Sequence, residues 1–255
     1  MDEESLYYAD TIGNVNIYIQ GEAGTTTEKY INHLLSGKYK KHKETIERLQ
    51  KYTKHPIDVN IVLEIDSHLG DVKGSTKAQK HLFSRKMKQY NITIQADDMY
   101  VLTHEFCHVI DQIGTKNQLS KSPEFEPIND LYKKELNTFI QHIEQNNEIS
   151  ETHRTNLLKY WNDPYRNGEV PTEIFARLCE QYLTKQEDLL ETPNNKLDQF
   201  DEFCIQLYKK YENQIETYFD TVLNHPDKSE ELTETDVQAF KLNLESLDSG
   251  IELSR

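Results

Sequence analysis

His104, Glu105 and His108 form the pattern H-E-x-x-H. On a helix, this spacing places the two imidazoles one turn apart on the same face, with the carboxylate beside them. Zinc in catalytic sites takes three protein ligands and keeps one position open for water, and neutral imidazoles suit it well. The pattern therefore predicts that the two histidines bind zinc. It also predicts that Glu105 misses the metal and acts on the water as a general base.

The residues around the pattern favour a helix. Opposite the histidines, apolar residues recur with the period of one helical stripe: Leu102, Phe106, Val109 and Ile113. The stripe predicts that this helix buries one face in the core. His104, His108 and Asp111 are then expected on the opposite face. Asp111 is then either a residue that orients a ligand imidazole or an ordinary solvated acid at a helix end. Cys107 points away from the ligand face and is expected to pack in the core.

A third ligand has to come from another part of the chain. Residues 173–183 follow Pro171 and are apolar on nearly every side, which predicts a buried helix. Glu173 opens this helix, and a buried carboxylate without a partner is costly, so we expect Glu173 to be the third ligand. An ion pair with Arg177, one turn later, would also explain it. The other candidates for the third ligand are Glu180, Glu169, and a histidine such as His142 or His153.

The two segments together resemble the core of the gluzincin zinc metallopeptidases. Residues 103–111 read THEFCHVID, and residues 167–177 read NGEVPTEIFAR. They are similar in particular to the catalytic domain of anthrax lethal factor and to related bacterial and mobile-element metallopeptidase domains. The resemblance covers roughly residues 88–185. Cys107 departs from it, because the family usually has a small residue there, and the linker between the two helices is longer than the family leads us to expect.

The resemblance implies a zincin-like fold and a set of roles for named residues. His104, His108 and Glu173 would hold Zn²⁺, and Glu105 would be the general base. Tyr165 is the nearest match to a tyrosine that assists the transition state in this family, and it is expected to be catalytic together with Glu105.

The rest of the chain predicts an α+β fold that is mostly helical, with a small mixed sheet. Alternating or β-branched segments predict strands at residues 15–20, 58–65 and 91–95. The last of these directly precedes the H-E-x-x-H helix and is expected at the edge of the sheet, where an extended peptide could add as a further strand. The basic residues 76–89 are predicted to form a short helix or a loop. A helix is expected over 27–54.

Further helices are predicted at 128–146, after Ser150, and at 197–223. We expect residues 1–225 to form one metallopeptidase domain. Residues 226–255 are expected to be an acidic C-terminal extension that contains one short helix.

Composition and charge limit the classes of function. The net charge of −15 disfavours binding to nucleic acid, and the basic stretch 38–90, with 13 basic and 6 acidic residues, is predicted to be a solvated surface. Three widely spaced cysteines do not predict a disulfide framework. The acidic start lacks the order of a secretory signal, and no run approaches the roughly 20 apolar residues of a membrane helix. The sequence therefore predicts a cytoplasmic protein without membrane contact, or one delivered to another cell by a non-classical route.

The sequence thus predicts a zinc-dependent endopeptidase that resembles a toxin or effector. Its expected partners are protein or peptide substrates. The alternative is a catalytically inactive zincin-fold module with a binding or regulatory role in a phage, plasmid or effector system. A third hypothesis is a metal-free helical interaction protein. Nothing in the sequence indicates an oligomeric state.

Overall fold

The computed structural model describes residues 6–12, 15–20, 58–65, 74–80, 87–94, 99–112, 118–187 and 198–224. Several parts of the sequence-based prediction lie outside these residues: the helix over 27–54, Ile113 of the apolar stripe, Gln95 at the end of the strand 91–95, residues 81–86, most of the basic stretch 38–90, and the extension 226–255 with its short helix.

The described sheet has five strands in the order β1-β2-β3-β5-β4. They are β1 (Leu6–Ile12), β2 (Val15–Gln20), β3 (Asp58–Ile65), β4 (Gly74–Lys80) and β5 (Met87–Ile94). The three central strands are parallel, and β1 and β4 run antiparallel to them on the two outer sides. The predicted mixed sheet is therefore confirmed, with two strands more than the sequence predicted.

The position of the strand before the H-E-x-x-H helix was predicted wrongly. β5 is an internal strand, because β4 pairs with its outer side over the whole length from Gly74–Ile94 to Lys80–Lys88. The segment predicted as a short helix or loop contains most of β4 and the start of β5. β4 is polar and carries an exposed lysine, Lys77, which is typical of a last strand that avoids pairing with other chains. This composition hides the strand from a search for apolar alternation.

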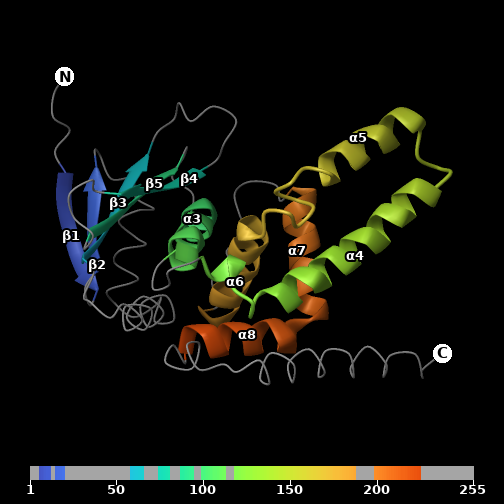
Figure 1. Cartoon of the computed structure of the whole chain (residues 1–255). Coiled ribbons are helices and arrows are strands. Elements are labelled where there is room, and N and C mark those ends of the chain that lie inside the picture. The colour runs from blue at the N-terminus through green and yellow to red at the C-terminus, as the bar shows by residue number, and fades with distance from the viewer. Residues whose placement is uncertain are drawn as a thin grey trace.

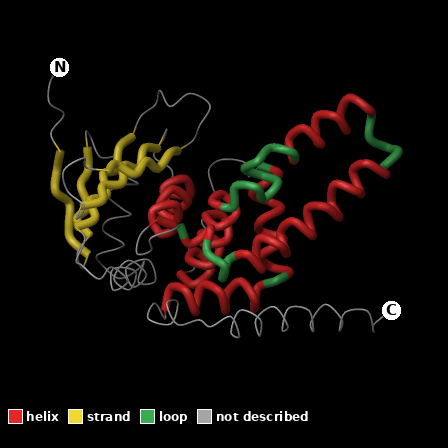
Figure 2. The backbone as a smooth tube through the Cα atoms, viewed as in Figure 1, coloured by secondary structure: helices red, strands yellow, loops and turns green. Residues whose placement is uncertain are grey.

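Six described helices and one short 3-10 turn, η2 (Leu119–Lys121), follow the sheet. The helices are α3 (Met99–Gln112), α4 (Glu126–Gln145), α5 (Glu151–Trp161), α6 (Thr172–Glu187), α7 (Gln199–Lys210) and α8 (Glu212–Asn224). Strands and helices are segregated along the molecule, and α3 lies between them (Figures 1 and 2). This is the predicted α+β class. None of the described helices is both long enough and apolar enough to cross a lipid bilayer.

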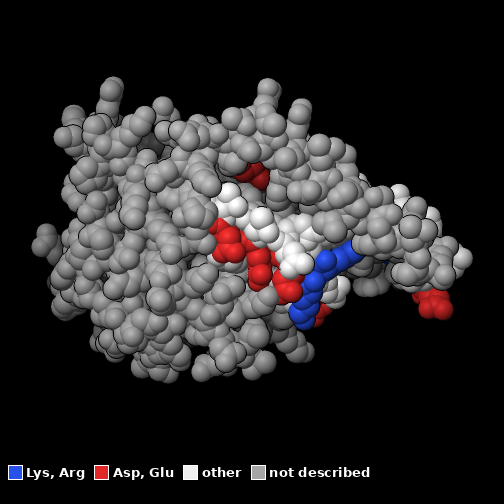
Figure 3. Space-filling model, turned by 90° about the horizontal axis from the view of Figure 1, so that it is seen from below, with Lys and Arg blue, Asp and Glu red and all other residues white. Residues whose placement is uncertain are grey.

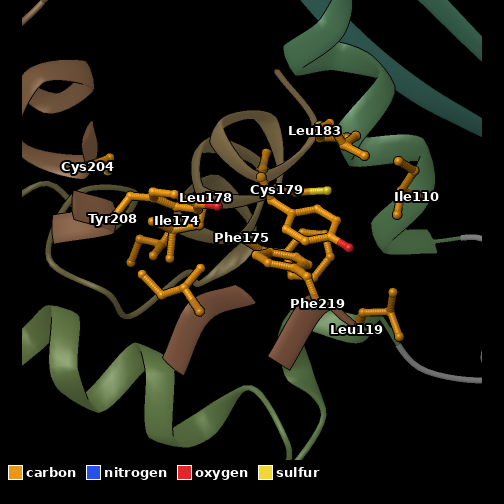
Figure 4. Close-up of a cluster of buried hydrophobic side chains, with 14 of the residues drawn as sticks. Ile110, Leu119, Ile174, Phe175, Leu178, Cys179, Leu183, Cys204, Tyr208 and Phe219 are labelled. Atoms are coloured by element: carbon orange, nitrogen blue, oxygen red, sulfur yellow. The ribbon is translucent and has the colours of Figure 1, made fainter. Parts of the chain in front are cut away.

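α6 lies at the centre of the helical body and contacts α3, α7 and α8. Its side chains are buried on nearly every side, as the sequence predicted (Figure 4). Phe175 packs edge-on against Phe219 of α8, with ring centroids 5.4 Å apart. Cys107 of α3 is also fully buried, so its predicted place in the core is confirmed, and all three cysteines are free thiols. These contacts hold α6 rigidly in place. They therefore also fix the position of its first turn, which carries Glu173.

The helix predicted over 197–223 is two helices in the structure, α7 and α8, which meet at Tyr211. No proline or glycine marks this break in the sequence. At the break, the Tyr211 hydroxyl donates to Glu135 Oε1 of α4 over 2.5 Å, and Lys210 Nζ donates to the same oxygen over 2.7 Å. These tertiary contacts lie where the chain turns from α7 into α8. Local sequence does not reveal them.

α4 and α5 form a long hairpin that projects away from the rest of the molecule (Figure 1). Both helices were predicted, and Ser150 caps α5 by accepting from the His153 N–H over 3.4 Å. The base of the hairpin holds the loop that leads into α6. There Asn129 donates to the Gly168 carbonyl over 3.1 Å, and the Tyr132 hydroxyl donates to the Arg166 carbonyl.

α8 carries acidic residues four positions apart, Glu212, Glu216 and Asp220. The Tyr208 hydroxyl donates to Glu216 over 3.1 Å, and the Tyr182 hydroxyl donates to Asp220 over 2.6 Å. Seen from below, the molecule shows a row of acidic side chains beside a basic group (Figure 3). The hydrogen bonds from the two tyrosine hydroxyls account for Glu216 and Asp220 on α8 without a bound ligand.

A substitution at Gly74 tests the contact between β4 and α3. A Cβ atom there would lie 2.7 Å from Glu105 Oε1 and 2.8 Å from Val101 Cγ1. We expect Gly74→Ala to lower the free energy of unfolding by about 1–3 kcal/mol, as overpacking usually does. Urea denaturation measures this. Ser75→Ala, at the next position and on the opposite face of the strand, is the control, and equal stability of the two variants would contradict the packing described here.

Candidate metal centre

α3 and α6 bring three predicted ligand residues together. His104 Nε2 lies 3.2 Å from His108 Nε2 and 3.4 Å from Glu173 Oε2, and His108 Nε2 lies 3.3 Å from Glu173 Oε1. Among the described residues, this is the one group of three or more metal-ligating side chains whose ligand atoms converge. The sequence predicted all three, from two segments that lie far apart along the chain.

The spacing of these atoms fits a shared ion. Zinc binds imidazole nitrogen and carboxylate oxygen at about 2.0–2.1 Å, so two ligand atoms of a tetrahedral site lie about 3.3–3.4 Å apart. The observed separations of 3.2–3.4 Å match this value. Direct N–H···O hydrogen bonds would be closer, near 2.9 Å. Two imidazoles and one carboxylate are also a donor set of catalytic zinc sites that leaves one position open.

The charges around the group favour a cation. Burial and the Arg177 guanidinium oppose a charge on His104, but Glu173 and Glu180 outweigh them and raise the pKa of His104 to about 9. Burial likewise opposes a charge on Glu173, yet contacts with His104 and His108 hold its pKa well below the ordinary range. The group is therefore built to surround positive charge, which a proton or a metal ion can supply.

Glu180, an alternative third ligand, lies behind His104 instead of beside the ligand atoms. Its Oε2 is 3.4 Å from His104 Nδ1, the ring nitrogen that faces away from Glu173. Arg177 forms ion pairs with Glu180 at 3.6 Å and with Asp201 at 2.8 Å. The sequence also allowed an ion pair between Glu173 and Arg177. The contacts of Arg177 with Glu180 and Asp201, and of Glu173 with the two histidines, account for both charges without that pair.

Glu105, the predicted general base, lies between α3 and the last strand of the sheet. Its side chain is buried, with 5% of the residue exposed. The Thr76 hydroxyl of β4 lies 2.7 Å from Glu105 Oε2 and 2.9 Å from the Glu105 carbonyl oxygen. Glu105 is offset from the three ligand atoms, as the helical spacing predicted. Thr76 was missed, because it lies in a segment without a recognisable strand pattern and meets Glu105 only in the folded chain.

Asp111 has neither of the two roles that were considered for it. It is fully buried and accepts hydrogen bonds from the Ser120 N–H over 2.6 Å and from the Ser120 hydroxyl over 2.9 Å. Burial raises the pKa of Asp111 although the bonds from Ser120 oppose the rise. It is therefore not a solvated acid, and its hydrogen bonds tie the end of α3 to η2 instead of orienting an imidazole.

The remaining candidates lie apart from the three ligand atoms. Glu169 is exposed in the loop before α6, and His142 and His153 are exposed on the α4–α5 hairpin. Tyr165 is 55% exposed, and its side chain makes no hydrogen bond to another described residue. Its catalytic role stays a prediction.

The effect of Thr76 can be tested without reference to catalysis. Thr76→Val replaces the hydroxyl with a methyl group of similar size and removes a donor from the buried Glu105 carboxylate. We expect a loss of about 1–3 kcal/mol in the free energy of unfolding, measured by urea denaturation. Thr76→Ser keeps the hydroxyl and should stay close to wild type. A Thr76→Val protein as stable as Thr76→Ser would show that this hydrogen bond contributes nothing.

No family model, no curated protein and no solved structure matches this chain. Function therefore has to be inferred from the site itself. The site offers two imidazoles and a carboxylate around a position suited to a divalent cation, with a second, buried carboxylate next to His104 on the same helix.

Proposed function

We propose that this protein is a zinc-dependent endopeptidase. The observation that carries the proposal is the convergence of His104, His108 and Glu173 at separations typical of one tetrahedral ion. The adjacent Glu105 supports hydrolysis over simple ion storage, because a structural zinc site needs four ligands and no neighbouring base.

The residues would divide the chemistry as follows. His104, His108 and Glu173 would hold the ion, which when bound lowers the pKa of a water molecule and polarises the substrate carbonyl. Glu105 would accept the proton of that water and pass it to the leaving amine, while Thr76 holds its carboxylate in place. Tyr165 would donate to the oxyanion if the loop before α6 carries its hydroxyl to the substrate.

The sheet supports a peptide as the substrate. β4 is the last strand of the described sheet, and Gly74 and Thr76 on this strand contact Glu105. An extended peptide that added to β4 by main-chain hydrogen bonds would run alongside the general base. The role that the sequence gave to the strand before α3 therefore passes to β4 in this proposal.

One observation favours a second candidate, an inactive zincin-fold module with a binding or regulatory role in a phage, plasmid or effector system. The Glu105 carboxylate is buried and hydrogen-bonded to Thr76. A general base has to reach the water, so a Glu105 fixed in this contact would leave a metal site without catalysis.

Incubation with a proteome-derived peptide library separates these candidates. The protein is stripped of metal and then supplied with one equivalent of zinc or with chelator, and new peptide ends are identified by mass spectrometry. The endopeptidase predicts cleavage only with zinc. Stoichiometric zinc without cleavage would favour the inactive module. If the protein binds no zinc, both candidates fail and the metal-free helical protein remains.

A further inference from the structure

A chain of buried charged groups runs from the ligand group into the C-terminal helices. Glu180 Oε2 lies 3.4 Å from His104 Nδ1 and 3.6 Å from Arg177 Nη1. Arg177 Nη1 in turn lies 2.8 Å from Asp201 Oδ1 of α7. The side chains of Glu180 and Asp201 are 0% and 4% exposed, and that of Arg177 is 18% exposed. Charged groups this deeply buried need a reason, since an isolated one is strongly destabilising.

The position of Glu180 on α6 relates it to the ligands. Seven residues, or two helical turns, separate it from Glu173, so both carboxylates lie on the same face of α6. Glu173 reaches His104 Nε2, and Glu180 reaches the other nitrogen of the same ring, Nδ1. The imidazole is thus held between two carboxylates of one rigid helix.

We propose that Glu180 is a positioning residue of the metal centre, which accepts the Nδ1–H of His104 and leaves Nε2 free for the ion. A neutral imidazole carries one proton on either nitrogen, and the hydrogen bond made by one nitrogen decides which of them binds metal. The inference rests on the proposed zinc site and adds a residue that the pattern of histidines and glutamates does not identify.

Asp201 connects this arrangement to α7. Its Oδ2 accepts from the Asp198 N–H over 3.1 Å in the capping box of α7, and its Oδ1 pairs with Arg177. Each oxygen therefore has a separate partner, and the first turn of α7 is fixed to the guanidinium that contacts Glu180. The metal centre accordingly extends beyond residues 88–185, where the two sequence motifs lie.

Zinc titration against a competing chelator tests the proposal on the full chain. Glu180→Gln keeps the shape of the side chain and removes its charge, and we expect zinc affinity to fall about 10–100-fold, as is usual when a partner of a ligand imidazole is changed. Asp201→Asn should give a smaller loss, because it acts through Arg177. Glu135→Gln is the matched control, since Glu135 pairs with Lys210 and Tyr211 where α7 and α8 meet and is not among the group of three ligand residues. Its zinc affinity should equal that of wild type.

A spectroscopic measurement supports the test even if a variant does not fold. In zinc-loaded wild-type protein labelled with ¹⁵N-histidine, His104 should show a protonated Nδ1 and a metal-bound Nε2. The reverse assignment would overturn the proposal without any substitution. Unchanged zinc affinity and unchanged His104 signals in Glu180→Gln would overturn it as well, while leaving the zinc site intact. Wild-type protein that binds no zinc would reject the zinc site itself, and the role of Glu180 with it.

Discussion

Glu173→Ala protein is expected to bind zinc about 10²–10³-fold more weakly than wild type. Structural zinc sites with four ligands bind with about 10–16 kcal/mol, or roughly 2.5–4 kcal/mol for each ligand, and about 1.4 kcal/mol corresponds to a factor of ten. The substitution removes the one ligand that α6 contributes and leaves two imidazoles on α3. The loss of affinity should therefore be larger than that expected from any change behind the ligands.

Chelator competition measures this loss, and metal content after desalting gives an independent value. Glu169→Ala is the control, because Glu169 is an exposed glutamate four positions earlier in the loop before α6. We expect this variant to keep wild-type zinc content. Tight zinc binding by Glu173→Ala would mean that another residue is the third ligand.

Glu105→Gln is expected to lower the rate of peptide cleavage by about 10²–10⁴-fold while zinc affinity stays within a few-fold of wild type. Glutamine matches the size of glutamate and can still bond to the Thr76 hydroxyl, but it cannot accept a proton from water. Because Glu105 lies outside the group of three ligand atoms, the ion should remain in place.

The rate is measured on a peptide that the library experiment identifies as a substrate, with zinc content determined on the same samples. Glu135→Gln, which changes a half-buried carboxylate that contacts Lys210 and Tyr211, should keep wild-type activity. Full cleavage by zinc-loaded Glu105→Gln would exclude Glu105 as the general base. In that case the general base would have to be a carboxylate outside α3.

The three residues that converge in the candidate metal centre could be predicted because local sequence determines them. His104 and His108 are fixed by the geometry of one helical turn, and Glu173 stands out as an acid in the first turn of a helix that is otherwise apolar. β3 was recognisable by its β-branched residues and β2 by its alternation. In each case, the signal lies within about one element.

The parts that escaped prediction depend on contacts between distant segments. Thr76 meets Glu105 only because β4 folds over α3, and β4 is too polar to be recognised as a strand. Glu180 could be named as a possible ligand, but its position behind His104 depends on how α6 lies against α3. Asp111 was misread for the same reason, because its partner Ser120 comes from the turn after its helix.

Along the chain, the α4–α5 hairpin separates α3 and α6, the two helices that carry His104, His108 and Glu173. This separation affects the entropy of closing the site. An ion bound by His108 and Glu173 would close a loop that contains the whole hairpin. The entropy of loop closure depends weakly on length, with each doubling adding only about 0.6 kcal/mol. The residues at the base of the hairpin, such as Asn129, set the start of α6, whereas its projecting end contributes length alone. Insertions or deletions at that end are therefore expected to leave closure of the site almost unchanged.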